Sequence, residues 1–188
     1  MSDCARRATY QDVLDTPPNQ VAEVLNGVLH ATPRPSVSSR NVTSVLAGEL
    51  YLPFRRGIKG PGRWALLVEP ELHLGTDPDI VIPDIAAWRR DRMPQIPMRN
   101  AAIFLAPDWV CEVISPSTEA LDRRDKMEIY ARELVAHYWL IDPRLRLLEV
   151  YRIDGGRFAR VGTWEGDVTV RAAPFDAVEI ELGVLWQE

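Results

Sequence analysis

The sequence holds few of the residues on which several classes of site depend. It has two cysteines, Cys4 and Cys111, and three scattered histidines, so it offers no close ligand pairs for a structural zinc site. One cysteine lies near a terminus and the other lies inside an apolar run, and we expect no disulfide between them. A Gly-rich phosphate-binding loop and a Ser-His-Asp arrangement are also missing. These absences argue against a zinc-binding or disulfide-rich scaffold.

Long hydrophobic runs are missing as well. No apolar run approaches the roughly 20 residues that a membrane-spanning helix needs. The first residues, Met1 to Arg7, are not followed by the apolar segment of a secretory signal. We therefore expect a cytoplasmic protein with no membrane partner.

Lysine is the scarcest of the charged residues. The 22 basic residues include only two lysines, Lys59 and Lys126. Arginine supplies nearly all the positive charge, so each lysine is a candidate for a role that needs a compact ammonium with a tunable pKa. The net charge of −5 argues against strong non-specific binding to a polyanion, which clustered Lys and Arg drive. It does not exclude a nucleic-acid enzyme whose basic groups lie on one face.

The length of 188 residues and the apolar fraction of 46% predict a single domain over residues 1–188 with a real core. Asn26-Gly27 between two β-prone runs predicts a hairpin, and the next segment has helical spacing with a cap at Ser38 or Ser39. The expected order is a hairpin (21–33), a helix (36–54), strands (64–74, 80–88 and 109–115), a helix (119–134), a strand (137–141), a hairpin (147–164) and one or two short strands. This order predicts a mixed α/β sheet with helices packed on it.

Two carboxylates stand on neighbouring predicted strands. Asp84 ends the run Val81-Ile82-Pro83-Asp84, and Glu112 is embedded in the apolar run 109–115. An ionised acid is costly to bury unless it is paired or binds a metal, which makes Glu112 the most informative residue. Mg²⁺ or Mn²⁺ prefers oxygen ligands, and Lys126 could orient a water or stabilise an oxyanion, so the three residues favour phosphodiester hydrolysis. A turn-forming Asp84 and a salt-bridged Glu112 are the alternatives.

Several motifs occur in the order found in a known family. They are Val81-Ile82-Pro83-Asp84, the early run 23–29 and the segments 108–118, 122–130 and 137–143. On these motifs the chain resembles the Uma family of putative restriction endonucleases, in the PD-(D/E)XK nuclease superfamily, over about residues 20–155. The resemblance implies a restriction-endonuclease-like fold, with a mixed β-sheet flanked by helices and with N-terminal and C-terminal β-hairpins. It also implies a Mg²⁺ site and cleavage of DNA.

The resemblance assigns roles by position. Asp84 is the acid of the Pro-Asp motif and Glu112 is the acid of the E-x-K motif. The lysine of the superfamily would fall at Ile114, so the strict pattern fails, and the family places it on the following helix at Lys126. The backbone carbonyl of Val113 is a candidate further metal ligand.

Weaker candidates surround these three residues. Tyr130 is four residues after Lys126 and shares its helix face, although core packing is the alternative for this side chain. A further acid often joins such sites. Glu23, in the matching early motif, is preferred over Glu49 and Glu71.

Three functions stay open at this point. The first is a Mg²⁺-dependent endonuclease acting on DNA, with a homodimer expected because nucleases of this fold often pair to cut two strands. The second is a binding or regulatory module that keeps the fold without the chemistry, which the acidic net charge favours. The third is a hydrolase of another phosphoester, such as a nucleotide or RNA.

Overall fold

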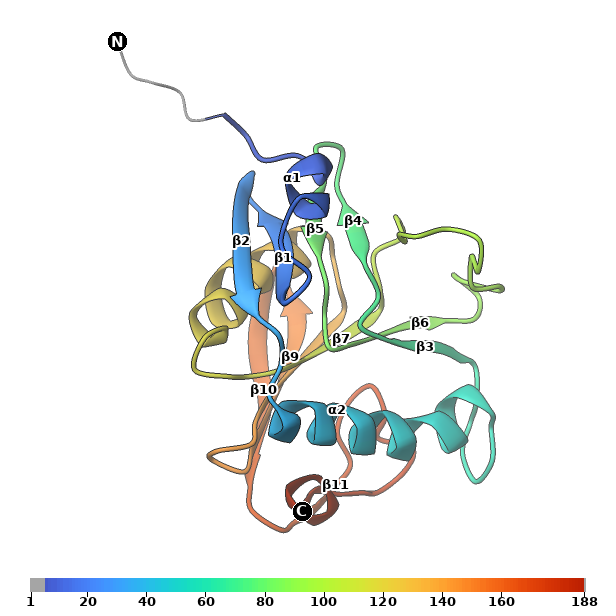
Figure 1. The fold of residues 1–188 in the computed structure, drawn as a ribbon. Helices are drawn as coiled ribbons and strands as arrows, with labels where there is room; N and C mark the ends of the chain where they lie inside the picture. Colours follow the sequence, from blue (N-terminus) through green and yellow to red (C-terminus); the bar gives the residue numbers. More distant parts are fainter. Residues whose placement is uncertain (1–5, 188) are drawn as a thin grey trace.

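A computed structural model describes residues 6–187, so Cys4 and the expectation about its disulfide lie outside the described residues. Its largest sheet has six strands in the spatial order β10-β9-β8-β7-β6-β3 (Figure 1). Only β7 and β8 pair in parallel, and the other neighbours are antiparallel. The bounds are β3 (Trp64–Val68), β6 (Ile85–Arg89), β7 (Trp109–Val113), β8 (His137–Asp142), β9 (Leu147–Asp154) and β10 (Arg157–Glu165). The predicted mixed sheet is confirmed.

A second, smaller sheet has the order β2-β1-β5-β4 and is antiparallel throughout. Its strands are β1 (Gln20–Leu25), β2 (Val28–Pro33), β4 (Leu72–Leu74) and β5 (Asp79–Val81). Leu25 pairs with Val28 across the predicted two-residue turn, where Asn26 and Gly27 have φ of 52° and 80°. Both residues need a positive φ in such a turn, which is why Asn-Gly forms it readily. Two short strands, β11 (Thr169–Val170) and β12 (Ile180–Glu181), pair near the C-terminus.

The predicted strand over 80–88 is wrong in one respect: it is two strands in two different sheets. The chain leaves β5 after Val81 and enters β6 at Ile85. Pro83 has no amide hydrogen to donate to a strand ladder. The amides on either side donate to side chains instead, with Ile82 N bonding Glu23 Oε1 at 2.7 Å and Asp84 N bonding Glu112 Oε2 at 3.3 Å. Asp84 therefore lies at the junction between the sheets.

The expected strand over 64–74 is divided in the same way. β3 ends at Val68 and β4 begins at Leu72, and Glu69 between them has a φ of 47°. The amide of Glu69 donates to the carbonyl oxygen of Asp84 at 3.0 Å. The two crossings from sheet to sheet are thus tied together at the junction.

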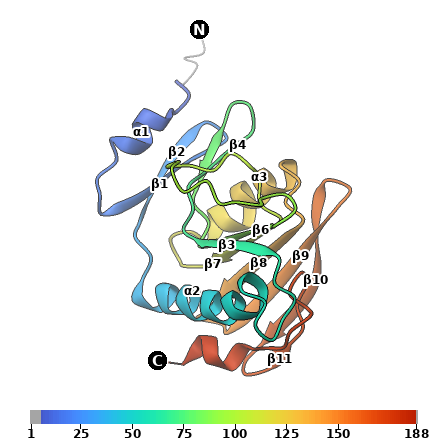
Figure 2. The ribbon, with the colours of Figure 1, turned by 90° about the vertical axis from the view of Figure 1, so that its right-hand side faces the viewer.

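Helices cover both faces of the large sheet (Figure 2). One face carries α2 (Val37–Leu50), which continues into a π-helical turn, η1 (Tyr51–Arg55). The other carries a π-helical segment, η2 (Leu121–Lys126), followed directly by α3 (Met127–Arg132). A short α1 (Tyr10–Leu14) precedes β1, and a 3₁₀ turn, η3 (Leu182–Trp186), lies near the C-terminus. Within residues 6–187, no helix is long and apolar enough to cross a membrane.

The two faces have separate apolar cores because side chains alternate along each strand. In β7, Trp109, Cys111 and Val113 pack in the cluster that contains the α2 residues. Val110 and Ile114 pack in the other cluster, with Ile129 and Tyr130 of α3. Glu112 has the parity of Val110 and Ile114, so its side chain points to the α3 face.

The N-terminus of α2 is capped by Ser36, and the predicted caps Ser38 and Ser39 are wrong. The Oγ of Ser36 accepts a hydrogen bond from the amide of Ser39 at 3.1 Å. We expect Ser36→Ala to lower the free energy of unfolding by about 1 kcal/mol, the usual value of a serine cap. Ser38→Ala, at an exposed position in the first turn, is the control. Equal losses in urea denaturation for the two variants would contradict the assignment.

Candidate functional site

A buried lysine lies at the centre of the charged cluster on the α3 face. Nζ of Lys126 is 2.9 Å from Oε1 of Glu23 and 3.2 Å from Oε1 of Glu112. It is also 3.5 Å from Oδ1 of Asp122. The four side chains are each 5% exposed or less. Three separate segments, β1, β7 and η2, thus bring three acids to one ammonium group.

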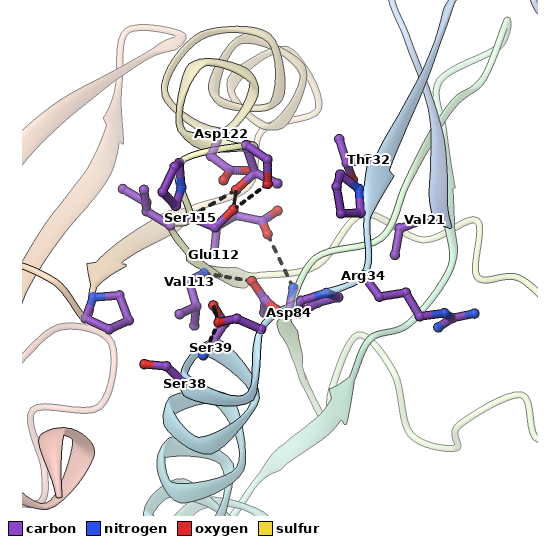
Figure 3. Close-up of a pocket in the computed structure, with 18 of the residues that line it drawn as sticks. Val21, Thr32, Arg34, Ser38, Ser39, Asp84, Glu112, Val113, Ser115 and Asp122 are labelled. Atoms are coloured by element: carbon purple, nitrogen blue, oxygen red, sulfur yellow. Dashed lines mark hydrogen bonds between the residues drawn. The ribbon is translucent and has the colours of Figure 1, made fainter. Parts of the chain in front are cut away.

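Asp84 reaches the cluster from the junction between the sheets. Its Oδ2 accepts a hydrogen bond from the amide of Val113 at 2.7 Å, while its own amide donates to Oε2 of Glu112 at 3.3 Å. These two bonds fix the junction to the end of β7. They also place the two carboxylates predicted from the sequence side by side (Figure 3).

Tyr130 extends the cluster on α3. Its hydroxyl donates to Oε1 of Glu112 at 2.9 Å, and the side chain is fully buried. Oε1 of Glu112 therefore accepts from both Tyr130 and Lys126, whereas Oε2 accepts only the long bond from Asp84 among the described residues. Oε2 of Glu112 therefore has more free capacity to accept a hydrogen bond or to bind a cation than Oε1.

Of the three candidate third acids, the structure brings Glu23 into the cluster. Glu49 is exposed on α2, and Glu71 pairs with His73, with Oε1 and Nε2 2.8 Å apart. Glu23 arrives because β1 pairs with β5 at Val24 and Ile80, next to the junction.

Asp122 also belongs to the cluster, although the sequence motifs did not predict it as a site residue. It is 2% exposed, and its Oδ1 has no hydrogen-bond partner within the described residues. Its distance of 3.5 Å from Lys126 is that of an ion pair and too long for a strong hydrogen bond. The sequence feature that indicates Asp122 is its spacing of four residues from Lys126, which puts both side chains on one helix face.

The charges of the cluster do not cancel. Burial lowers the pKa of Lys126, but Glu112, Glu23 and Asp122 outweigh burial and hold that pKa well above its ordinary value. Lys126 therefore keeps its proton. Burial, opposed by Lys126 and reinforced by the other acids, raises the pKa of Glu112 well above the usual range. The excess of acids over one ammonium group favours the binding of a cation.

Burial also raises the pKa values of Asp84 and Tyr130. Burial raises the pKa of Asp84 to about 6, against the opposing effects of the Val113 amide and of Lys126. Burial and then the charge of Glu112 raise the pKa of Tyr130 well above its ordinary value. Tyr130 thus stays a neutral phenol that donates to Glu112.

The cluster forms one wall of a cavity of about 360 Å³, which we call the acid cavity. Asp84, Glu112, Asp122 and Lys126 line it together with the segment from Thr32 to Ser36 and the turn from Ser115 to Thr118. Figure 3 shows Ser38 and Ser39 of α2 on the opposite side of Asp84 from Asp122. Charged side chains of the cluster thus border the acid cavity.

The bond between Tyr130 and Glu112 has a testable energetic value. We expect Tyr130→Phe to lower the free energy of unfolding by about 1–3 kcal/mol, because a buried carboxylate loses a donor that water does not replace. Tyr151→Phe is the matched control, since its hydroxyl donates to Oε1 of Glu149 at 3.0 Å. Glu149 is also held by Arg123 and Arg160, so the control should lose less. A larger loss for the control in guanidinium denaturation would contradict this ranking.

A family comparison covers nearly the whole chain. The model of the Uma2 family, whose description is "Putative restriction endonuclease", matches residues 7–183. The chain belongs to the Uma2 family. The matched range runs from before α1 into the last 3₁₀ turn. Every residue of the charged cluster of this Uma2 protein therefore lies within that range. The resemblance stated from the motifs is confirmed.

A solved structure supports the fold of this Uma2 protein. The crystal structure of a putative nuclease belonging to DUF820 from Anabaena variabilis ATCC 29413 superposes with a TM-score of 0.74 at 19% sequence identity. The alignment covers 95% of this chain and 97% of that chain. At this identity the likeness shows the fold, and it confirms the predicted fold class. No curated protein matches the chain.

Proposed function

We propose that this protein is a nuclease that uses a divalent metal, Mg²⁺ or Mn²⁺, to hydrolyse phosphodiester bonds of DNA. The observation that carries the proposal is the convergence of Lys126, Glu112 and Asp84 on the wall of the acid cavity. Membership of the Uma2 family and the likeness to a structure described as a putative nuclease support the nuclease class.

The residues of the cluster fit a hard divalent cation. Mg²⁺ is commonly bound by one or two carboxylates and keeps several waters. Asp84 and Glu112 would supply those carboxylates, and the backbone carbonyl of Val113 would add a third oxygen. Within residues 6–187, no group of three or more His, Cys, Asp or Glu side chains is arranged to hold a metal by itself. This donor set favours an ion that completes its shell with water and phosphate over one that needs a full protein cage.

The chemistry divides between the cation and the side chains. A bound divalent cation would neutralise charge at phosphorus and lower the pKa of a water. Lys126 stays protonated, so it acts by orienting that water and stabilising developing negative charge, and it does not act as a base. Tyr130 positions Glu112 through the hydrogen bond to Oε1.

Metal-dependent cleavage tests the proposal. Purified protein should cut DNA in Mg²⁺ or Mn²⁺ and should be inactive in EDTA, with single-stranded, duplex and branched substrates compared side by side. Calorimetric titration with Mg²⁺ should show binding that competes with Mn²⁺. Absence of both binding and cleavage would favour the non-catalytic module, and cleavage restricted to RNA or nucleotides would favour the other phosphoester hydrolase.

Three expectations from the sequence stay predictions. They are a homodimer, a cytoplasmic location and a single domain over residues 1–188 with its core at about 20–155.

A further inference from the structure

A second cavity adjoins the acid cavity. It measures about 380 Å³, and we call it the side cavity. The two cavities share a boundary that consists of Val21, Arg34, Pro35, Ile82 and Asp84. Figure 3 shows Arg34 extending from the neighbourhood of Asp84 away from Ser115 and Asp122. Asp84 thus stands between two adjoining spaces, each of a size that takes a small ligand.

The walls of both cavities combine apolar and polar side chains. The acid cavity carries the carboxylates and a group of hydroxyls, which are Thr32, Ser36, Ser38, Ser39, Ser115, Ser117 and Thr118. The side cavity has an apolar part, formed by residues such as Val13, Leu14, Pro17 and Pro18, and a polar part that includes Thr16, Gln20, Arg34 and Glu69. No aromatic side chain lines either cavity within the described residues. Each space thus offers apolar side chains that can contact a base and polar side chains that can contact a sugar-phosphate, which suits a nucleotide chain with little preference for the base.

Positive charge at the two cavities is scarce. Lys126 is already paired with acids of the cluster. Arg144 is paired with Asp142 and Glu119. Arg34 differs: its Nε donates to the carbonyl of Pro18 at 2.9 Å, and its terminal nitrogens make no hydrogen bond or ion pair within residues 6–187.

Among the residues that line the two cavities, one guanidinium is thus available for phosphate. A protein that makes about 6–10 phosphate contacts with a duplex needs Lys and Arg side chains within reach of each phosphate. The acids at the site would also repel the dense phosphates of a duplex, and they are recessed, with Glu112 and Asp122 each 2% exposed. A flexible strand can bend one phosphate down to these acids at a lower cost than a stiff duplex.

We propose that the substrate is an unpaired DNA strand, two consecutive nucleotides of which occupy the acid cavity and the side cavity. This inference rests on the proposed nuclease function. The phosphate to be cut lies at Asp84, and the neighbouring phosphate is held by Arg34. The hydrogen bond from Arg34 to Pro18 fixes the guanidinium stem at the edge of the side cavity.

Binding of labelled oligonucleotides tests the substrate class. Fluorescence anisotropy in Ca²⁺ compares a single strand of about 12 nucleotides, its blunt duplex and the duplex with an unpaired tail. The single strand and the tailed duplex should bind about tenfold more tightly than the blunt duplex, with a shallow slope of log K against log salt of roughly −1 to −2. Cleavage in Mg²⁺ should occur within the unpaired part. Equal binding of the blunt duplex, or a salt slope steeper than about −4, would overturn the inference.

Three variants test the placement of the strand. Arg34→Ala should weaken binding about fivefold and reduce the salt slope by about 1, because one phosphate contact is lost. Glu69→Gln should tighten binding about twofold, because it removes a negative charge from the exposed rim of the side cavity. Arg40→Ala, an exposed arginine of α2 outside both cavities, should change neither quantity. The opposite signs for Arg34 and Glu69 separate a local contact from a general loss of folding, and the same sign for both would contradict the placement.

The outcomes distinguish this inference from the proposed function. Preference for the unpaired strand without cleavage of any DNA would contradict the nuclease and leave the binding inference standing. Equal binding and cutting of blunt duplex would do the reverse. Absence of both binding and cleavage would overturn both.

Discussion

Glu112→Gln is expected to reduce the rate of metal-dependent DNA cleavage by at least about 100-fold, the scale of losing a main electrostatic group of an active site. The fold should survive. Glutamine keeps an oxygen that can accept from Tyr130, and Lys126 keeps Glu23 and Asp122 as partners. Because the change also removes one of the mutually repelling acids, the melting temperature should stay the same or rise. Calorimetric titration should show weakened Mg²⁺ binding by the same variant.

Glu149→Gln gives the opposite pattern and is the matched control. Glu149 is also a buried acid of the large sheet, in β9, and it pairs with Arg123 and Arg160. Its replacement should lower stability, since two arginines lose their charged partner, and leave cleavage close to the wild-type rate. A Glu112→Gln protein that cuts DNA at the rate of the Glu149→Gln protein would remove Glu112 from the proposed site.

Lys126→Met is expected to lower the free energy of unfolding by about 3–5 kcal/mol, the cost of leaving buried charges without their partner. Methionine has a similar length and no charge, so the loss measures charge compensation more than packing. DNA cleavage should fall to the background at the same time, because the ammonium that stabilises developing negative charge is gone. Urea denaturation and a cleavage assay at a temperature where the variant stays folded would measure the two effects separately.

The other lysine provides the comparison. Lys59 is exposed in the loop after η1, and Lys59→Met should change neither stability nor cleavage. Adding Glu23→Gln to Lys126→Met should recover about 1–2 kcal/mol, because one uncompensated acid is removed and the bond from the Ile82 amide is retained. A further loss in the double variant would show that packing, and not excess charge, destabilises the single variant.

Local signals determined the elements and the main pair of the site. Asn26-Gly27 formed the predicted turn because both residues tolerate a positive φ, which depends on nothing outside the turn. The apolar run around Glu112 showed that an acid would be buried in a strand, and its burial is confirmed. The scarcity of lysine made Lys126 a candidate, and its Nζ lies 3.2 Å from Oε1 of Glu112.

The cap of α2 marks the limit of such local signals. Ser36, Ser38 and Ser39 are all suitable cap residues by type, and only the backbone geometry selects one. Ser36 has an extended backbone, and its Oγ accepts a hydrogen bond from the amide of Ser39. The two later serines already lie in the helix.

The sequence by itself determined the Asn26-Gly27 turn, the burial of Glu112 in an apolar strand and the choice of Lys126 as the candidate lysine of the site. Only the tertiary structure decided the rest of the cluster around Asp84. Glu23 reaches it through the pairing of β1 with β5. The strand is interrupted at Pro83, where the amides of Ile82 and Asp84 donate to Glu23 and Glu112 from other strands. Turn and periodicity signals depend on neighbouring residues, whereas the meeting of two sheets depends on long-range pairing that no single segment encodes.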